Sequence, residues 1–176
     1  MISDIGSFLD WFAGVHRRTV RDVSILPAEA ETWSPAAGSN EEAWGVPKLV
    51  QHIAEARGFF GGAFVGGGWV WDAWPQELSA REGWVPALEE SLAMFRSQVG
   101  AAPPDRLTAR ITQIDTPDRT VSGWRALMMM AEHEVAHRSQ IGAYAGLNGW
   151  PVAQIFGRTN EWVVEQRDEQ LRRRAT

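Results

Sequence analysis

Apolar residues recur at intervals of three and four along several stretches of the chain, which is the period of an amphipathic helix. The first stretch runs from Ile5 to Leu26, follows a polar Ser-Asp pair and stops before a proline. The second begins at Pro47, which suits the first position of a helix because its missing N–H would have no partner there. It ends in the glycines at 66–68. Both patterns predict helices that bury one face.

Three further stretches follow the same rule. Residues 85–100 open with a proline near the start and close with Gly100, so they predict a third helix. A fourth helix is expected from about Ser122 to Leu147, where a glycine and a proline shortly afterwards enforce its end. The amphipathic stretch at 160–174 predicts a fifth.

The connections between these helices are unequal in length. Residues 27–46 contain two prolines, many small residues and no sustained period, so they predict a long connection that could wrap a site. Residues 105–121 alternate β-branched and polar positions around a DTPD turn, which fits either a small hairpin or an extended crossing. No alternation of strands with helices is present. The sequence therefore predicts an all-α fold, a four-helix bundle with an additional C-terminal helix and long connections.

Length, charge and cysteine content narrow the classes of function. A chain of 176 residues fits one domain, so we expect 1–176 to form a single bundle domain. The formal charge of −5 gives no electrostatic reason to expect a nucleic acid or an anionic membrane as partner. The absence of cysteine excludes disulfides, thiolate ligands and a cysteine nucleophile, and it suits a reducing cytoplasm. With no leader pattern and no apolar run near the ~20 residues that span a bilayer, we expect a cytoplasmic protein.

Two histidines, His133 and His137, stand four residues apart on the predicted fourth helix. In a helix they lie ~40° apart around the axis and ~6 Å apart along it, so both imidazoles face the same way. Their neighbours on that face are largely apolar, which indicates that the face points inward: Ala126, Met130, Gln140, Ile141 and Tyr144. His52 occupies a similar face of the second helix. Histidines on such faces are either hydrogen-bonded core residues or, from facing helices, ligands of a metal site with an open position.

The His133, Glu134 and His137 sequence is also the H-E-x-x-H motif of zinc proteases, in which the glutamate is the general base. The extended form of that motif fails, because Gln140 and Ala143 stand where glycine and histidine should be. A third ligand would have to come from a downstream glutamate such as Glu161 or Glu165. That interpretation leaves His52 unexplained, so the sequence disfavours a protease.

Glu134 has a second interpretation. It precedes Arg138 by four residues, the favourable order for an ion pair on a helix surface, and it lies ~100° from His133, at the margin of the inward face. We therefore favour a structural or supporting role for Glu134 over that of a catalytic base. His16, which is followed by two arginines, is expected at the surface or at the boundary of the core.

Ten tryptophans are an excess for this length, and three of them crowd into the GWVWDAWP stretch: Trp69, Trp71 and Trp74. Large rings that fill a small core and cover helix ends are the favoured explanation. The alternative is a pocket wall, for which Trp69 and Trp71 are the candidate substrate-binding residues.

Two segments, AWGVPKLVQHIAEA and HEVAHRSQIGAYAGLNGWPV, resemble the hallmark segments of the DinB/YfiT-like superfamily of damage-inducible helical bundle proteins. The resemblance implies a stress-response protein in which His52, His133 and His137 bind one divalent metal, commonly zinc or nickel. It also implies a homodimer, for which the first and third helices could supply a surface. Two positions depart from the family pattern: Ala136 and Ser139 stand where many relatives have histidine and glycine, so no catalytic role of that extra histidine carries over.

Three neutral imidazoles leave the charge of a metal available to an exogenous ligand, and such a metal acidifies a bound water or thiol. The resemblance therefore implies a small-molecule substrate and one of two chemistries. We favour transfer of a low-molecular-weight thiol such as bacillithiol or mycothiol over metal-dependent hydrolysis. Glu134, Gln140 and Tyr144 are the candidate catalytic residues. The alternative outside catalysis is a metal-binding or interaction bundle with a closed coordination shell.

Overall fold

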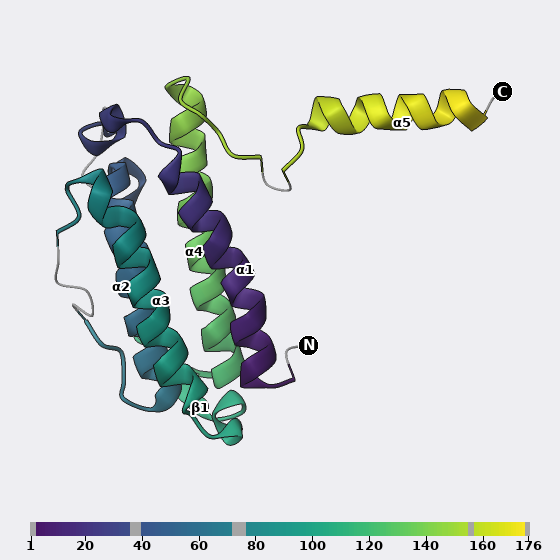
Figure 1. Ribbon diagram of the computed structural model, residues 1–176. Coiled ribbons are helices and arrows are strands. Elements are labelled where there is room, and N and C mark those ends of the chain that lie inside the picture. The colour runs from purple at the N-terminus through teal and green to yellow at the C-terminus, as the bar shows by residue number, and fades with distance from the viewer. Residues whose placement is uncertain (1–2, 36–39, 72–76, 155–156, 175–176) are drawn as a thin grey trace.

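The computed structural model describes residues 3–35, 40–71, 77–154 and 157–174, and these residues form a helical bundle with a small hairpin (Figure 1). The helices are α1 (Ile5–Ser24), α2 (Val46–Val65), α3 (Trp84–Gly100), α4 (Gly123–Leu147) and α5 (Asn160–Arg174). The first four lie side by side, and α5 extends away from the end of α4 (Figure 1). The predicted four-helix bundle with an additional C-terminal helix is confirmed.

Local chemistry accounts for where the helices start and stop. The Asp4 carboxylate accepts a hydrogen bond of 2.7 Å from the Ser7 N–H, which caps the first turn of α1. A proline in the first turn of α2 costs no hydrogen bond. At the other end of α2, Gly66 takes a left-handed conformation with φ of 94°, which a residue with a side chain rarely adopts.

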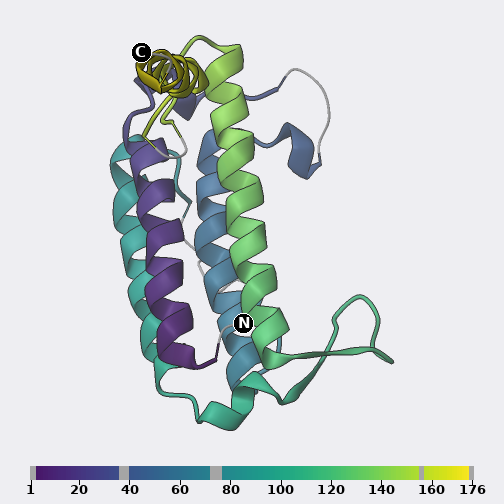
Figure 2. The same ribbon diagram turned by 90° about the vertical axis from the view of Figure 1, so that its right-hand side faces the viewer.

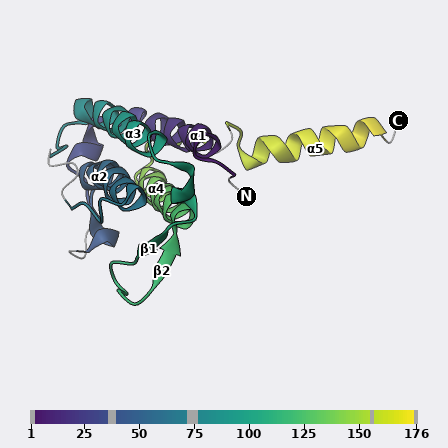
Figure 3. The same ribbon diagram turned by 90° about the horizontal axis from the view of Figure 1, so that it is seen from below.

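Each helix of the bundle packs against two neighbours: α2 lies against α3 and α4, and α1 lies against the same two helices (Figure 3). The α1 and α4 helices run in one direction, and α2 and α3 run in the other (Figure 1). Because α2 and α3 are parallel, the connection between them has to span the length of the bundle. The α2 and α4 helices are antiparallel, so residues midway along each lie opposite one another.

Short elements fill the connections. The connection after α1 contains two single-turn 3-10 helices, η1 (Ala28–Glu31) and η2 (Glu41–Ala43). Two more, η3 (Arg81–Gly83) and η4 (Pro104–Leu107), flank α3. The segment that sequence left open as hairpin or crossing forms an antiparallel hairpin of β1 (Arg110–Thr112) and β2 (Thr120–Ser122), with Ile111 opposite Val121 (Figure 2).

A buried polar layer lies between the two larger apolar clusters of the core formed by the described residues. One cluster, at the level of Leu49 and Trp84, lies toward the end of the bundle where α2 and α3 begin, and the other surrounds Phe12 and Phe95. Five buried side chains from all four helices form the layer between them: His16, Thr19, Arg57, Ser91 and Glu134. We call this set the polar layer.

Arg57 is the centre of the polar layer and has no exposed surface. Its Nε and Nη2 groups donate to the Glu134 carboxylate at 3.0–3.2 Å, and Nη2 also donates to His16 Nδ1 at 3.0 Å. Its Nη1 donates to Ser91 Oγ at 2.9 Å and to the Leu88 carbonyl. Buried charges are tolerated when they are paired and hydrogen-bonded in this way.

Two residues lie deeper than the sequence predicts. Glu134 is 1% exposed and His16 is 3% exposed, so Glu134 lies inside the margin at which it was expected, and the placement of His16 at the surface or at the boundary of the core was wrong. Glu134 pairs with Arg57, whereas Arg138 lies 3.7 Å from a carboxylate oxygen of Asp22. The physical reason is rotation of α4: its histidine face is directed at the seam with α2, which turns the neighbouring Glu134 toward the bundle axis.

The α5 helix contributes nothing to this core, because none of its residues is buried. Trp162 and Leu171 on it are 42% and 56% exposed. Within the described ranges, no helix is both long and apolar enough to cross a membrane.

Candidate metal centre

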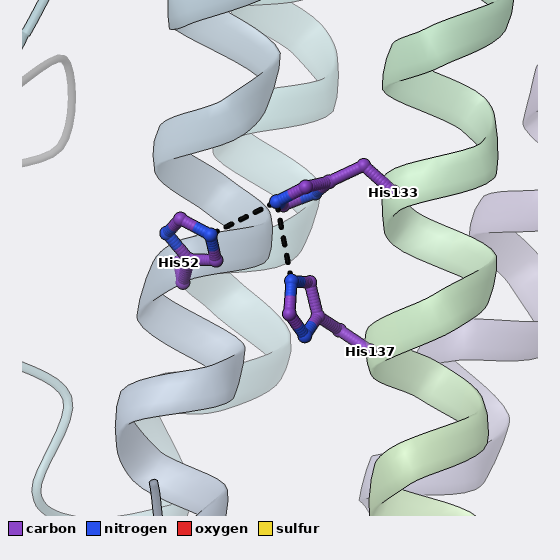
Figure 4. A group of neighbouring side chains, drawn as sticks. All are labelled: His52, His133 and His137. Carbon is purple, nitrogen blue, oxygen red and sulfur yellow. Dashed lines mark hydrogen bonds between the residues drawn. The ribbon is translucent and has the colours of Figure 1, made fainter. Parts of the chain in front are cut away.

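Three histidines meet at the seam between α2 and α4 (Figure 4). His52 lies on α2, and His133 and His137 lie one turn apart on α4. The Nε2 atom of His133 lies 2.9 Å from Nε2 of His52 and 3.2 Å from Nε2 of His137. The structure thus brings together the three residues that the sequence singled out, with candidate ligand atoms that all lie within 4.8 Å of one another.

Hydrogen bonds alone do not explain this convergence. Each imidazole nitrogen has one in-plane position, which holds either a proton or a lone pair. His133 Nε2 faces two neighbouring Nε2 atoms, so one of these contacts is left without a matched donor and acceptor. Two nitrogens at 2.0–2.1 Å from a tetrahedral zinc ion lie about 3.4 Å apart, close to the observed separations. The three-histidine group could therefore bind a divalent metal ion.

The environment favours the neutral imidazole, which is the form that carries a lone pair for a metal. Burial is the main cause that lowers the pKa of His133 to about 3, and the like charges of His137 and His52 contribute to the same shift. Burial is also the main cause that lowers the pKa of His52. Both shifts favour the neutral imidazole, in which one ring nitrogen keeps its lone pair for a metal.

Gln140, which lies three residues after His137 on α4, orients the His137 ring. Its Oε1 atom lies 3.1 Å from His137 Nδ1, which as the protonated nitrogen donates to it and leaves the Nε2 lone pair for a metal. The Gln140 amide donates to Tyr144 Oη at 2.7 Å and to the Glu41 carbonyl at 3.0 Å. Of the candidate catalytic residues, Gln140 and Tyr144 thus lie beside the site, in a chain that ends at His137.

His52 has a similar support on α2. Its Nδ1 atom lies 3.7 Å from a carboxylate oxygen of Glu55, one turn along the helix. The indole of Trp44 lies 5.1 Å from the His52 ring, centre to centre, and covers it from the connection that precedes α2. Carboxylates beside a ligand imidazole orient the ring and raise its basicity.

Glu41 is a site residue that sequence reasoning missed. Its Oε1 atom lies 3.4 Å from His137 Nε2, and its side chain is 55% exposed. It belongs to η2, inside the aperiodic connection at 27–46, so no helical period relates it to the histidines. The only signal was the length of that connection, which indicated a segment able to wrap a site. A carboxylate at this place could act as a fourth ligand or as a base.

A pocket of about 240 Å³ opens next to His52 and His133. Its other walls are mostly apolar: Ala56, Phe59, Phe60, Val70 and Trp71, with Glu55 at the side. Trp71, a predicted substrate-binding residue, is among these walls. Trp69 is not: its ring packs on Phe59 and Phe60, and its indole N–H donates to the Thr112 carbonyl at 2.8 Å. Trp74 lies outside the described residues.

A glycine allows the chain to close one side of this pocket. A Cβ atom on Gly62 would lie 2.6 Å from Val70 Cγ2 and 2.9 Å from the Gly68 carbonyl oxygen. Only a residue without a side chain lets the segment after α2 fold back this closely onto the helix. Gly62 therefore sets the position of Val70 and of the adjacent Trp71.

The protease interpretation does not fit this geometry. Glu134 points into the polar layer, where Arg57 and Thr19 occupy its carboxylate oxygens. It is therefore unavailable as the base that acts on a metal-bound water. Glu161 and Glu165 lie on α5, which extends away from the bundle and from the three histidines (Figure 1).

Comparisons with known proteins agree with this fold. A family model described as "DinB family" matches residues 1–169. A crystal structure of a DinB-like protein from Bacillus cereus ATCC 10987 superposes with a TM-score of 0.69 at 15% identity, covering 88% of this chain and 99% of its own. A second, of the DinB-like protein YjoA from Bacillus subtilis, gives 0.64 at 17% identity, covering 84% and 96%. No curated protein matches the chain.

Proposed function

The chain belongs to the DinB family, and on that premise we propose that it is a metal-dependent enzyme that transfers a low-molecular-weight thiol onto an electrophile. Its ligands would be His52, His133 and His137, and its metal would be zinc or nickel. The observation that carries the proposal is the pocket that opens beside two of these histidines. A site that serves only to stabilise a fold is closed by protein ligands, whereas a catalytic site keeps access for a substrate.

A divalent ion held by three neutral imidazoles lowers the pKa of a bound thiol or water, because its charge is not neutralised by its ligands. The chain contains no cysteine, so the thiol has to come from outside, as bacillithiol or mycothiol would. Gln140 keeps His137 in the correct orientation. Glu41 Oε1, 3.4 Å from His137 Nε2, accepts the thiol proton. The sulfur electron pair then forms the S–C bond, and the leaving group departs with the electron pair of the bond that breaks.

The test is consumption of 1-chloro-2,4-dinitrobenzene by the zinc-loaded and nickel-loaded protein in the presence of bacillithiol, of mycothiol or of no thiol. We expect turnover that requires the thiol and disappears in His137→Ala. In Glu41→Gln we expect turnover to fall about 100-fold while the metal stays bound, which is the lower end of the usual contribution of a general base. Equal rates in His137→Ala and the native protein would refute the proposal.

Glu41 also favours a second candidate, metal-dependent hydrolysis. An exposed carboxylate beside the ligands is what activation of a water molecule requires. In this case product forms without any thiol, and Glu41→Gln again lowers the rate. If Glu41 is instead a fourth ligand, Glu41→Gln weakens metal binding itself, and the closed shell would support the non-catalytic metal-binding bundle.

We also propose that the protein is a homodimer. Trp11 on α1 and Met94 on α3 are 46% and 52% exposed, so the two helices that the sequence suggested as an interface do present apolar side chains. Light scattering should give a mass of two chains for the native protein and a lower mass for a Trp11→Glu, Met94→Glu variant. One chain in both proteins would contradict the dimer.

A further inference from the structure

The pocket beside the histidines has aromatic walls on one side and metal ligands on the other. The Phe59 ring lies 4.9 Å from the Trp71 ring and 5.4 Å from the Phe60 ring, centre to centre. His52 and His133 line the same pocket. A molecule inside it would therefore contact ring faces along its body and the candidate metal ligands at one end.

The size and charge of the pocket limit what it can hold. Its volume of about 240 Å³ is below the roughly 300–1,000 Å³ of sites for drug-sized ligands, so it fits a single substituted ring. Among the described residues that line it, Glu55 is the charged side chain; its carboxylate accepts a hydrogen bond of 2.8 Å from Gln51 and lies beside His52. The walls offer few partners to hydroxyl groups, and burying these without partners is unfavourable. A sugar-containing thiol is thus too large and too polar.

The opposite side of the site is polar. Because α2 and α4 are antiparallel, His133 lies level with the aromatic pocket, and His137 lies nearer the start of α2. There Glu41 approaches His137, and Gln140 and Tyr144 form the hydrogen-bonded chain behind it. Among the described residues, a polar ligand finds more hydrogen-bonding groups on this side, together with the Glu41 carboxylate.

We propose that the aromatic pocket binds the electrophilic substrate, that this substrate is a small uncharged molecule with a planar apolar body, and that the thiol approaches from the Glu41 side. This inference rests on the proposed thiol transfer. The reacting carbon then lies at the His133 end of the pocket. The thiol sulfur, which lies on the Glu41 side, forms a bond to this carbon while its proton passes to Glu41. The bond between the carbon and the leaving group breaks, and the leaving group departs as an anion.

Binding of an unreactive ring tests the pocket separately from catalysis. The probe is 1,3-dinitrobenzene, which has no leaving group, and its dissociation constant is measured by NMR titration of the zinc-loaded protein, with glucose as a polar probe of similar size. We expect Trp71→Ala to weaken binding about five-fold, the effect of one lost aromatic contact. Phe59→Leu should act similarly. Trp162→Ala, which removes a tryptophan from α5, should bind as the native protein does.

Metal content and turnover complete the test. Bound zinc should stay unchanged in Trp71→Ala, because its side chain is 68% exposed and is no candidate ligand. In the same variant, thiol-dependent turnover should fall by a larger factor for 1-chloro-2,4-dinitrobenzene than for iodoacetamide, which has no ring. Native-like binding of 1,3-dinitrobenzene in both pocket variants, or equal binding of glucose, would overturn the proposal. If probe binding follows the expected pattern and no thiol is transferred, the pocket assignment stands and the proposed function fails.

Discussion

Arg57 on α2 donates hydrogen bonds to both carboxylate oxygens of Glu134 on α4, at the centre of the bundle. Both side chains are buried, and Glu134 directly follows the candidate ligand His133. The middle residue of the H-E-x-x-H sequence thus joins the helices that carry the candidate metal ligands, while its neighbours face the site.

Removal of Glu134 should destabilise the fold. In Glu134→Ala the Arg57 charge stays buried without its partner, which costs about 3–5 kcal/mol in the free energy of unfolding. The double variant Arg57→Met, Glu134→Leu should regain most of the lost free energy of unfolding, because both charges are removed together. Urea denaturation measures all three proteins. A loss below about 1 kcal/mol in Glu134→Ala, combined with loss of turnover, would instead support a catalytic glutamate.

Gln140 should control metal affinity through His137. Its Oε1 atom is the partner of His137 Nδ1, and loss of such a supporting group weakens metal binding about 10–100-fold. We therefore expect Gln140→Leu to lower zinc affinity by this factor in a competition titration with a chelating dye. Gln170→Leu, an exposed change on α5, is the control and should have no effect. Native affinity in Gln140→Leu would show that His137 needs no such support.

His16 should make stability depend on pH. Burial, followed by the positive charge of Arg57, lowers its pKa in the folded protein below 6.5, although Glu89 and Glu134 oppose this. Below pH ~6.5 the unfolded chain therefore binds more protons than the folded one, so the free energy of unfolding falls as pH falls toward the lowered value.

His16→Gln removes the contribution of His16 protonation to stability. The free energy of unfolding of this variant should therefore fall less steeply than that of the native protein between pH 7 and 5. His52 and His133 have lowered pKa values as well, but they contribute equally to both proteins and cancel in the comparison. Urea denaturation of metal-free protein at several pH values gives the two slopes. Identical slopes would show that His16 titrates alike in the folded and unfolded chain.

Much of the fold could be predicted from the sequence because its helices follow simple rules. Apolar periodicity, Pro47 and Gly100 place the helix ends within two residues of those observed. The three histidines could be identified because few residue types bind metals and two of them share a face. Pairing of residues 110–112 with 120–122 could not be decided, since such short strands depend on their surroundings.

The buried charges were missed for a different reason. A charged residue is placed at the surface by default, yet Arg57 lies four residues after Ile53 and three before Phe60, on the apolar face of α2. This helical spacing could have identified Arg57 as buried. Glu134 lies four residues after the buried Met130, so the same spacing could have identified it as buried too. No pattern could have placed Glu41, because its position depends on contacts across 99 residues of chain, between its carbonyl and Gln140.

The ratio of metal to protein, measured by elemental mass spectrometry on tag-free chain, tests the central claim most directly. The native protein and His16→Gln, which removes a histidine outside the group, should each carry close to one zinc or nickel ion per chain. His52→Ala should lose it, because one of three ligands is gone. Metal retained unchanged in His52→Ala would remove His52 from the site and contradict the three-histidine centre.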